Sequence, residues 1–110
     1  MASEVNIYEI HAGFCKAIAN SKRLQIISLL EEGELSVNEI VERTEIPLTN
    51  VSQHLRILRH HDIVITRKEG QNVYYRLADL RLPKACRQIR AILLEGMTEK
   101  GKLIDKIKQK

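Results

Sequence analysis

The amino-acid sequence predicts one mainly helical domain that contains a single β-hairpin. Apolar side chains recur at helical intervals through most of the chain, whereas residues 63–77 are rich in β-branched and aromatic side chains around a Glu69-Gly70-Gln71 turn. The chain is 44% apolar but has only three Tyr, one Phe and no Trp, so aliphatic side chains must form the core. Domains commonly have about 100 to 150 residues, and we expect residues 1–110 to form one.

Four helices are predicted in the first half of the chain. The first covers IYEIHAGFCKAIAN. Each of the next three follows a start signal, which is a residue that accepts a hydrogen bond from the unpaired backbone N–H groups of a first turn or, for proline, lacks such a group. These signals are Asn20, the Ser36 and Glu39 capping box, and Pro47, which precedes a helix that runs to about Asp62. Gly33 is expected to end the second helix, which is apolar on most sides and therefore predicted to be central.

Helical spacing returns after Asp79. An apolar stripe is formed there by Leu82, Ala85, Cys86, Ile89, Ile92 and Leu93. Thr98 is predicted to cap a final lysine-rich helix. The stripe needs a partner surface, which either the same monomer or a second copy of the chain would supply.

The helix that follows Pro47 is predicted to have an apolar side and an unusual polar side. Leu48, Val51, Leu55 and Leu58 fall on the side expected to face the core. The opposite side carries Thr49, Gln53, Arg56 and His60, flanked by Ser52 and Arg59 on one edge and Asn50 on the other. A solvated face usually favours Glu and Lys, and neither occurs here, whereas Gln and Asn pair with adenine and Arg pairs with guanine in the DNA major groove.

The neighbouring segments fit the same interpretation. A short helix, an EIP turn and the polar helix make a helix-turn-helix over residues 36–62, and the hairpin of residues 63–78 would be its wing. Arg67, Lys68 and Gln71 near the hairpin tip are candidates for backbone or minor-groove contacts. Residues 1–55 hold four Lys and Arg against eight Asp and Glu, whereas residues 56–110 hold fourteen against six, and a basic half favours a polyanionic partner.

Three stretches resemble the ArsR family of winged-helix transcriptional repressors: AIANSKRLQIISLLEEGELSVNEI, SQHLRILR and TRKEGQNVYYRL. The resemblance implies a homodimer, joined through residues 1–19 and 79–110, that leaves an inverted-repeat operator when an inducer arrives. It also places Ser52, Gln53 and His54 in the recognition helix, although the helical wheel puts His54 nearer the core. Dimerisation has a physical argument as well, because one helix presents only about four residues to the groove.

Three sensing sites known in that family are not reproduced. Ser36-Val37-Asn38 stands where a C-x-C thiol site would lie in the third helix. Asp79 matches one position of a zinc site on the long helix, but Arg81, Ile92 and Glu95 occupy the others. The persulfide-responsive pair is also missing, because Ser28 stands at the position of its first cysteine and Cys86 comes too early for its second.

Two thiols are therefore the remaining candidates for a sensor. Cys15 and Cys86 lie on the two helices expected to meet in a dimer, and His11 lies one helical turn before Cys15. Thiolates would favour As(III), Cd(II) or Cu(I), and oxidants or sulfur species would act on the same atoms. The alternative is that both cysteines are small apolar core residues, in a regulator with no thiol or metal inducer.

Other classes of protein fit less well. We find no G-x-S-x-G sequence, glycine-rich phosphate loop, paired-histidine metal motif or plausible triad, so an enzyme is not expected. No apolar run is long enough to span a bilayer and no secretory signal is evident, so we expect a cytoplasmic protein. A winged helix that binds protein instead of DNA remains an alternative, and its binding to nucleic acid would depend little on salt.

Overall fold

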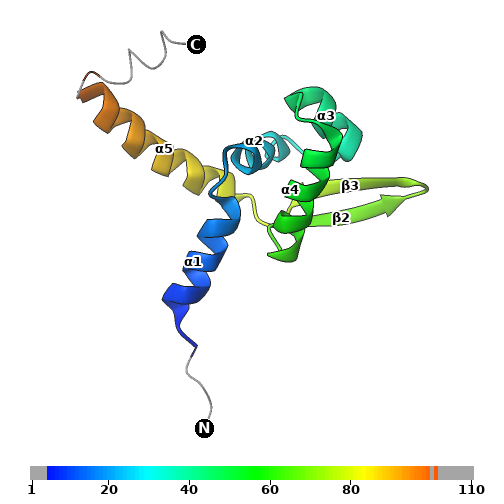
Figure 1. Cartoon of the computed structure of the whole chain (residues 1–110), viewed down its shortest axis with the longest axis horizontal. Coiled ribbons are helices and arrows are strands. Elements are labelled where there is room, and N and C mark those ends of the chain that lie inside the picture. Colours follow the sequence, from blue (N-terminus) through cyan, green and yellow to red (C-terminus); the bar gives the residue numbers. More distant parts are fainter. Residues whose placement is uncertain (1–4, 100, 102–110) are drawn as a thin grey trace. The chain divides into compact units, whose positions relative to one another are not determined.

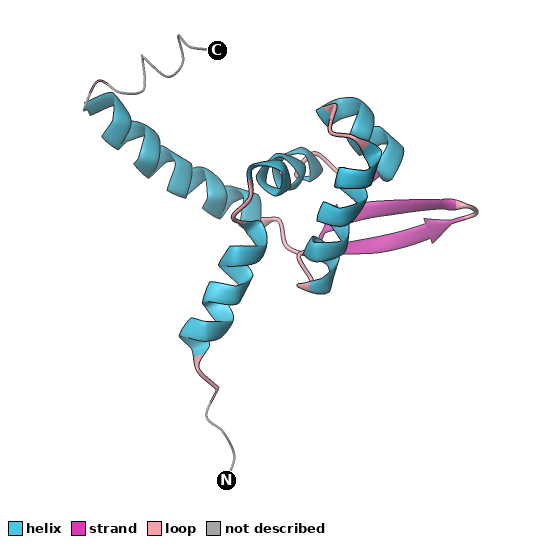
Figure 2. Cartoon of the chain, in the orientation of Figure 1, coloured by secondary structure: helices cyan, strands magenta, loops and turns pink. Residues whose placement is uncertain are grey.

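The computed structural model describes residues 5–99 and 101 and shows five helices and three strands among them (Figures 1 and 2). In chain order they are α1 (Ile7–Ile18), α2 (Ser21–Leu30), β1 (Leu35–Ser36), α3 (Val37–Thr44), α4 (Leu48–His60), β2 (Val64–Glu69), β3 (Asn72–Leu77) and α5 (Arg81–Glu99). The chain forms two compact units, Met1–Asp79 and Leu80–Lys110. No helix among the described residues is both long and apolar enough to cross a membrane.

The predicted helix starts are confirmed. The Asn20 side chain accepts hydrogen bonds from the backbone N–H groups of Lys22 and Arg23, at 2.9 and 3.2 Å. Ser36 and Glu39 form the reciprocal capping box, with both hydrogen bonds present. Pro47 occupies the N-cap position of α4 and makes no side-chain cap bond. The first turns of three successive helices are therefore set by local sequence.

The core of the first unit is aliphatic, as predicted, and α2 lies at its centre. Its side chains are 4% exposed or less: Ala17, Ile26, Ile27, Leu30, Ile40, Ile46, Val51, Leu55, Leu58, Ile63, Val64 and Leu77. The helix α2 contacts α3, α4 and β3, and α4 also contacts α1, α3 and β2. The helix α2 thus buries Ile26, Ile27 and Leu30 against these elements, while its polar side remains exposed.

The turn between α3 and α4 is held by its own hydrogen bonds. Glu45 adopts a left-handed conformation with φ 62° and ends α3. The Thr44 hydroxyl donates to the Ile40 carbonyl at 2.6 Å and accepts from the Ile46 N–H at 3.2 Å. Ile46 is 3% exposed and anchors the turn in the core. These contacts determine where α4 begins relative to α3.

The predicted hairpin is confirmed, and a third strand extends it. β2 and β3 pair antiparallel from Val64 opposite Leu77 to Glu69 opposite Asn72, and the hairpin projects from the helices (Figure 2). Gly70 has φ 62°, which suits the first position of a two-residue hairpin turn. The short strand β1 adds to the other edge of β3, so the sheet order is β1-β3-β2.

Two predictions from the sequence are wrong. Leu48 does not face the core but is 52% exposed, because it is the first residue of α4 and its side chain tilts toward the helix N-terminus, beyond the packed turns. Thr98 does not begin a new helix, since α5 continues through it to Glu99. The stop comes at Gly101, which has φ 74° and donates its N–H to the Thr98 carbonyl at 2.9 Å. The lysine-rich segment after Gly101 lies outside the described residues.

The second unit consists of α5 among the described residues. Pro83 and Cys86 are its buried side chains. Four apolar side chains further along it are exposed: Ile89, Ile92, Leu93 and Leu94. Within this chain the apolar stripe predicted after Asp79 is therefore covered only near its start.

Candidate nucleic-acid interface

The helix α4 has a buried side and a polar exposed side. Val51, Leu55 and Leu58 are at most 1% exposed. The exposed residues of the polar side are Thr49, Asn50, Gln53, Arg56, Arg59 and His60, and Ser52 is half-buried at its edge. No acidic residue occurs within α4. The side presented to solvent is thus rich in amide, hydroxyl and guanidinium groups that can donate hydrogen bonds to base edges and phosphates.

His54 differs from its neighbours because it turns toward α2. Its side chain is half-buried, and its Nδ1 atom lies 3.4 Å from Nη1 of Arg23. Burial lowers the pKa of His54 below its usual 6.5, and the charges of Arg23 and Lys22 lower it further. A neutral imidazole can accept the Arg23 hydrogen bond. The geometry therefore places His54 on the side of α4 that faces α2, in agreement with the helical wheel.

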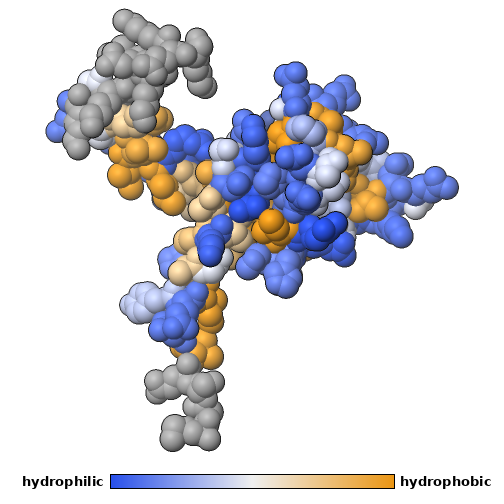
Figure 3. Space-filling view, in the orientation of Figure 1, coloured by the Kyte–Doolittle hydropathy of each residue, from blue (hydrophilic) through white to orange (hydrophobic). Residues whose placement is uncertain are grey.

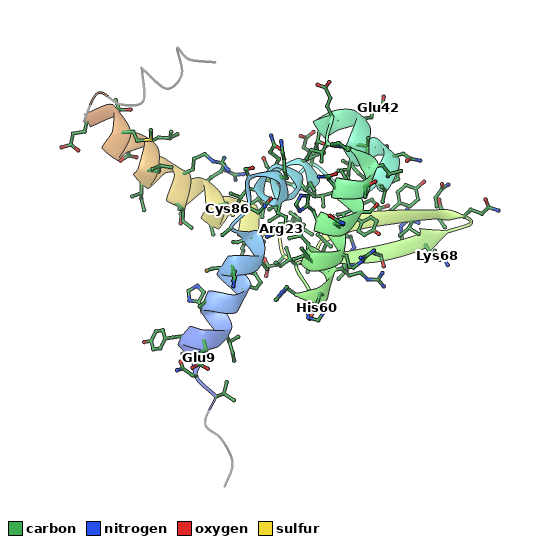
Figure 4. All side chains as sticks on the ribbon, viewed as in Figure 1. Glu9, Arg23, Glu42, His60, Lys68 and Cys86 are labelled. Atoms are coloured by element: carbon green, nitrogen blue, oxygen red, sulfur yellow. The ribbon has the colours of Figure 1, made fainter. Side chains whose placement is uncertain are left out.

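Arg23 lies in the first turn of α2, where Figure 4 labels it, and its guanidinium contacts His54 of α4. Its Nε atom is buried and has no hydrogen-bond partner among the described residues. Sequence reasoning did not select Arg23, since nothing in the local pattern distinguishes it from a solvated basic residue. Its pairing with a histidine 31 residues later appears only in the tertiary structure.

The three wing candidates occupy different environments. Lys68 and Gln71 are exposed, and Figure 4 shows Lys68 well along the hairpin. Arg67 is instead held by two carboxylates. Its Nε atom donates to both oxygens of Glu34 at 3.1 and 3.2 Å, its Nη2 atom donates to Glu34 Oε1 at 2.5 Å, and its Nη1 atom donates to Glu69 Oε1 at 3.0 Å. These hydrogen bonds lower the pKa of Glu34 and raise that of Arg67, so both groups stay ionised.

The register of the hairpin also separates these side chains. Val64, Thr66 and Lys68 alternate with Ile65, Arg67 and Glu69 along β2, so the two sets lie on opposite faces of the sheet. Arg76 pairs with Ile65 and shares the face of Arg67. It is an exposed basic residue that sequence reasoning did not select, although the strict alternation of the strand would have identified it.

The candidate thiols lie on different units. Cys15 is exposed on α1, as is His11 one turn earlier, whereas Cys86 is buried on α5. No group of three or more His, Cys, Asp or Glu side chains capable of holding a metal ion occurs among the residues that the structure describes. His11 and Cys15 together would supply two ligands to an ion, so further ligands would have to come from elsewhere.

A short helix, a tight turn, a second helix with an exposed polar face and an adjoining hairpin define a winged helix-turn-helix. Residues 20–66 match the family model described as bacterial regulatory protein, arsR family. The solved structure of HlyU from Vibrio cholerae is 35% identical, with 81% of this chain and 97% of that chain covered and a TM-score of 0.70. The chain belongs to the ArsR family.

Relatives in sequence include both an activator and a repressor. The transcriptional activator HlyU of Vibrio cholerae is 49% identical over 63 residues, which are 57% of this chain and 58% of that protein. The biofilm growth-associated repressor of Agrobacterium fabrum is 39% identical over 77 residues, which are 70% of this chain and 63% of that protein. In both comparisons, the matched segment spans less than two thirds of the relative's length.

A further solved structure carries a description of its assembly. The homodimeric winged helix-turn-helix DNA-binding domain Mb0332 of Mycobacterium bovis, described as a possible ArsR-family transcriptional regulator, is 32% identical. The match covers 86% of this chain and 92% of that one, with a TM-score of 0.71.

Proposed function

We propose that the chain is a sequence-specific DNA-binding transcriptional repressor that acts as a homodimer on an inverted-repeat operator. The observation that carries the proposal is the exposed face of α4, where Thr49, Asn50, Gln53 and Arg56 are exposed and acidic residues are absent. An α-helix fits the major groove, and these side chains can form hydrogen bonds to base edges. Ser52 supplements them from the edge of the face, whereas Arg59, Lys68 and Gln71 are positioned for backbone contacts.

The proposal of a homodimer rests on two exposed apolar surfaces. On α1 the surface consists of Ile7, Tyr8, Ile10 and Phe14, which are 37 to 80% exposed, and on α5 it consists of Ile89, Ile92, Leu93 and Leu94, which are 38 to 73% exposed. Figure 3 shows apolar atoms along each of these helices. Burial against a second copy would remove this surface from water. The homodimeric description of Mb0332 supports a dimer, without specifying which surfaces form it.

Two-fold symmetry determines the kind of operator. Each protomer would insert one α4 helix, so the two half-sites must be related by inversion and lie roughly 34 to 36 Å apart, about one turn of DNA. Repression then needs only occupancy of the promoter by the bound dimer. Release from the DNA is the step at which an inducer would act.

The inducer is proposed to be a thiophilic metal ion or metalloid, or a reagent that modifies cysteine. The exposure of Cys15 supports a reaction at that thiol, and His11 at the spacing of one turn would supply a second ligand. The burial of Cys86 supports the alternative for that residue, a small apolar side chain in a packed environment. If neither thiol binds or reacts with such an agent, the chain is a regulator without a thiol inducer.

The base-reading role is tested by changing Gln53 to Ala. A preferred duplex is first selected from random DNA, and binding to it and to an unrelated duplex is measured by fluorescence anisotropy. Loss of a bidentate contact should cost about 1 to 3 kcal/mol on the preferred duplex and relax the preference at one base pair of each half-site.

Gln25→Ala is the matched control, because Gln25 is also exposed but lies on α2, outside the helix-turn-helix. It should leave both affinities unchanged. Equal losses on the two duplexes for Gln53→Ala would contradict the assignment of Gln53 as a base reader. A winged helix that binds protein would instead select no preferred duplex.

A further inference from the structure

Arg67 is the residue of the wing whose donors are most fully used within the protein. All three guanidinium nitrogens donate hydrogen bonds, to Glu34 and Glu69. The guanidinium carbon also lies 4.8 Å from the centre of the Tyr74 ring, over its face. A phosphate that approaches this guanidinium would also meet the two carboxylates that already balance its charge.

The contact between Arg67 and Glu34 crosses the whole sheet. Tyr74 on β3 pairs with Arg67 on β2 and, at its other edge, with Ser36 on β1. The Arg67 side chain passes over Tyr74 and reaches Glu34, which immediately precedes β1. One side chain thus connects the outer strand of the wing to the segment on the far side of the sheet.

That segment leads directly into the helix-turn-helix. Two residues after Glu34, the Ser36 capping box begins α3, and α3 packs against α4. The Glu34 carboxylate therefore links the wing to the segment that begins α3, the helix against which α4 packs. Glu34 and Arg67 are 33 residues apart, so the link closes a long loop and is not a local strand contact.

The geometry separates this pair from an ordinary surface ion pair. A single exposed pair contributes little because water and salt screen it, but fork-like contacts of arginine with a carboxylate, and networks of several charges, are the recognised exceptions. Arg67 meets both conditions, since its Nε and Nη2 atoms contact one carboxylate and its Nη1 atom contacts another. The side chains of Glu34, Arg67 and Glu69 are 33%, 44% and 69% exposed, so the Glu34 contact is the more shielded of the two.

We propose that Glu34 and Arg67 form a clamp that positions the wing relative to the helix-turn-helix, and that Arg67 is not a phosphate contact. The clamp rests on the proposed DNA-binding function and revises one assignment within it. Phosphate contact by the middle of β2 falls to Lys68, which is exposed on the opposite face of the sheet. Arg67 is then a positioning residue, and Glu34 is part of the DNA-binding machinery without touching DNA.

The salt dependence of binding distinguishes a phosphate contact from a positioning residue. Each phosphate neutralised contributes about 0.9 to the slope of log K against log salt, so Lys68→Gln should reduce the slope of a dimer by about 1.8. Arg67→Gln should leave the slope within about 0.5 of the wild-type value while lowering the affinity for the preferred duplex about three- to tenfold. A decrease of the slope by about 1.8 for Arg67→Gln would overturn the proposal.

The partnership with Glu34 is tested by combining the two changes. Glu34→Gln and Arg67→Gln should each lower the ratio of preferred to unrelated duplex affinity by a similar factor, and the double variant should lose no more than either single variant. The ratio is used because removing a negative charge alone would strengthen binding to all DNA equally. If the double variant instead reduced the affinity ratio by the product of the two single factors, the residues would act independently and the clamp would be refuted.

A measurement without DNA separates failure of the clamp from failure of the proposed function. In the free protein, both Glu34→Gln and Arg67→Gln should accelerate amide hydrogen exchange in β2 and β3 about two- to fivefold, whereas Lys68→Gln should not change it. Unchanged exchange in the two clamp variants would refute the clamp while DNA binding stands. If the two clamp variants show accelerated exchange but the wild-type protein binds no duplex, the proposed function is refuted while the clamp stands.

Discussion

Truncation of two leucines on α4 tests how that helix divides between core and surface. Leu55 is 1% exposed and Leu48 is 52% exposed. Replacing leucine with alanine removes about three carbons, worth roughly 2.4 kcal/mol of transfer free energy at about 0.8 kcal/mol each. At Leu55 the cavity left behind adds to this loss, so Leu55→Ala should lower the free energy of unfolding by about 3 to 5 kcal/mol.

Leu48→Ala is the matched control because it makes the same chemical change on the same helix. About half of its side chain is already in water, and solvent can fill the space, so its loss should not exceed about 1.2 kcal/mol. The free energies are measured by urea unfolding followed by circular dichroism, at equal protein concentration because a dimer unfolds in a concentration-dependent way. Equal losses for the two variants would refute the assignment of Leu48 to the surface and the packing of α4 described above.

Three further predictions concern the sensor, the half-buried His54 of α4 and the dimer. The DNA-bound protein is titrated with As(III), Cd(II), Zn(II), Cu(I), persulfide and peroxide. One agent should release the protein from DNA, and Cys15→Ser should abolish this release. If no agent releases the wild-type protein and both Cys15→Ser and Cys86→Ser bind DNA normally, the thiols are structural. Burial, and then the charges of Arg23 and Lys22, lower the pKa of His54 in the folded state, so its contribution to stability is fully present above about pH 6.5 and is lost as pH falls through the folded pKa. His54→Gln should therefore flatten the decrease in unfolding free energy between about pH 8 and 5.5. An unchanged pH profile would contradict the half-buried position of His54 next to Arg23. Ile92→Glu, which places a charge on the exposed apolar surface of α5, should shift the protein toward monomer in sedimentation equilibrium and weaken operator binding, whereas an unchanged dimer would place the interface elsewhere.

The local features of the fold were predictable because each depends on a few adjacent residues. Asn20, the Ser36 capping box and Pro47 satisfy or avoid the free N–H groups of a first turn, and Gly70 supplies the positive φ of the hairpin turn. The periodicity of α4 likewise placed four residues on its core side, and three of them, Val51, Leu55 and Leu58, are buried. It failed at Leu48, because periodicity gives the direction of a side chain around a helix but not whether another element reaches that turn.

The sequence by itself determined the order of helices and strands, the aliphatic core and the polar face of α4, since these follow from spacing and side-chain chemistry within single segments. Only the tertiary structure decided which polar residues are free and which are held. His54 turns to Arg23 across 31 residues, and Arg67 is bound by Glu34 across 33. Such contacts depend on how distant segments pack together. The sequence around a carboxylate does not indicate whether it pairs with a guanidinium in the folded protein or is solvated by water.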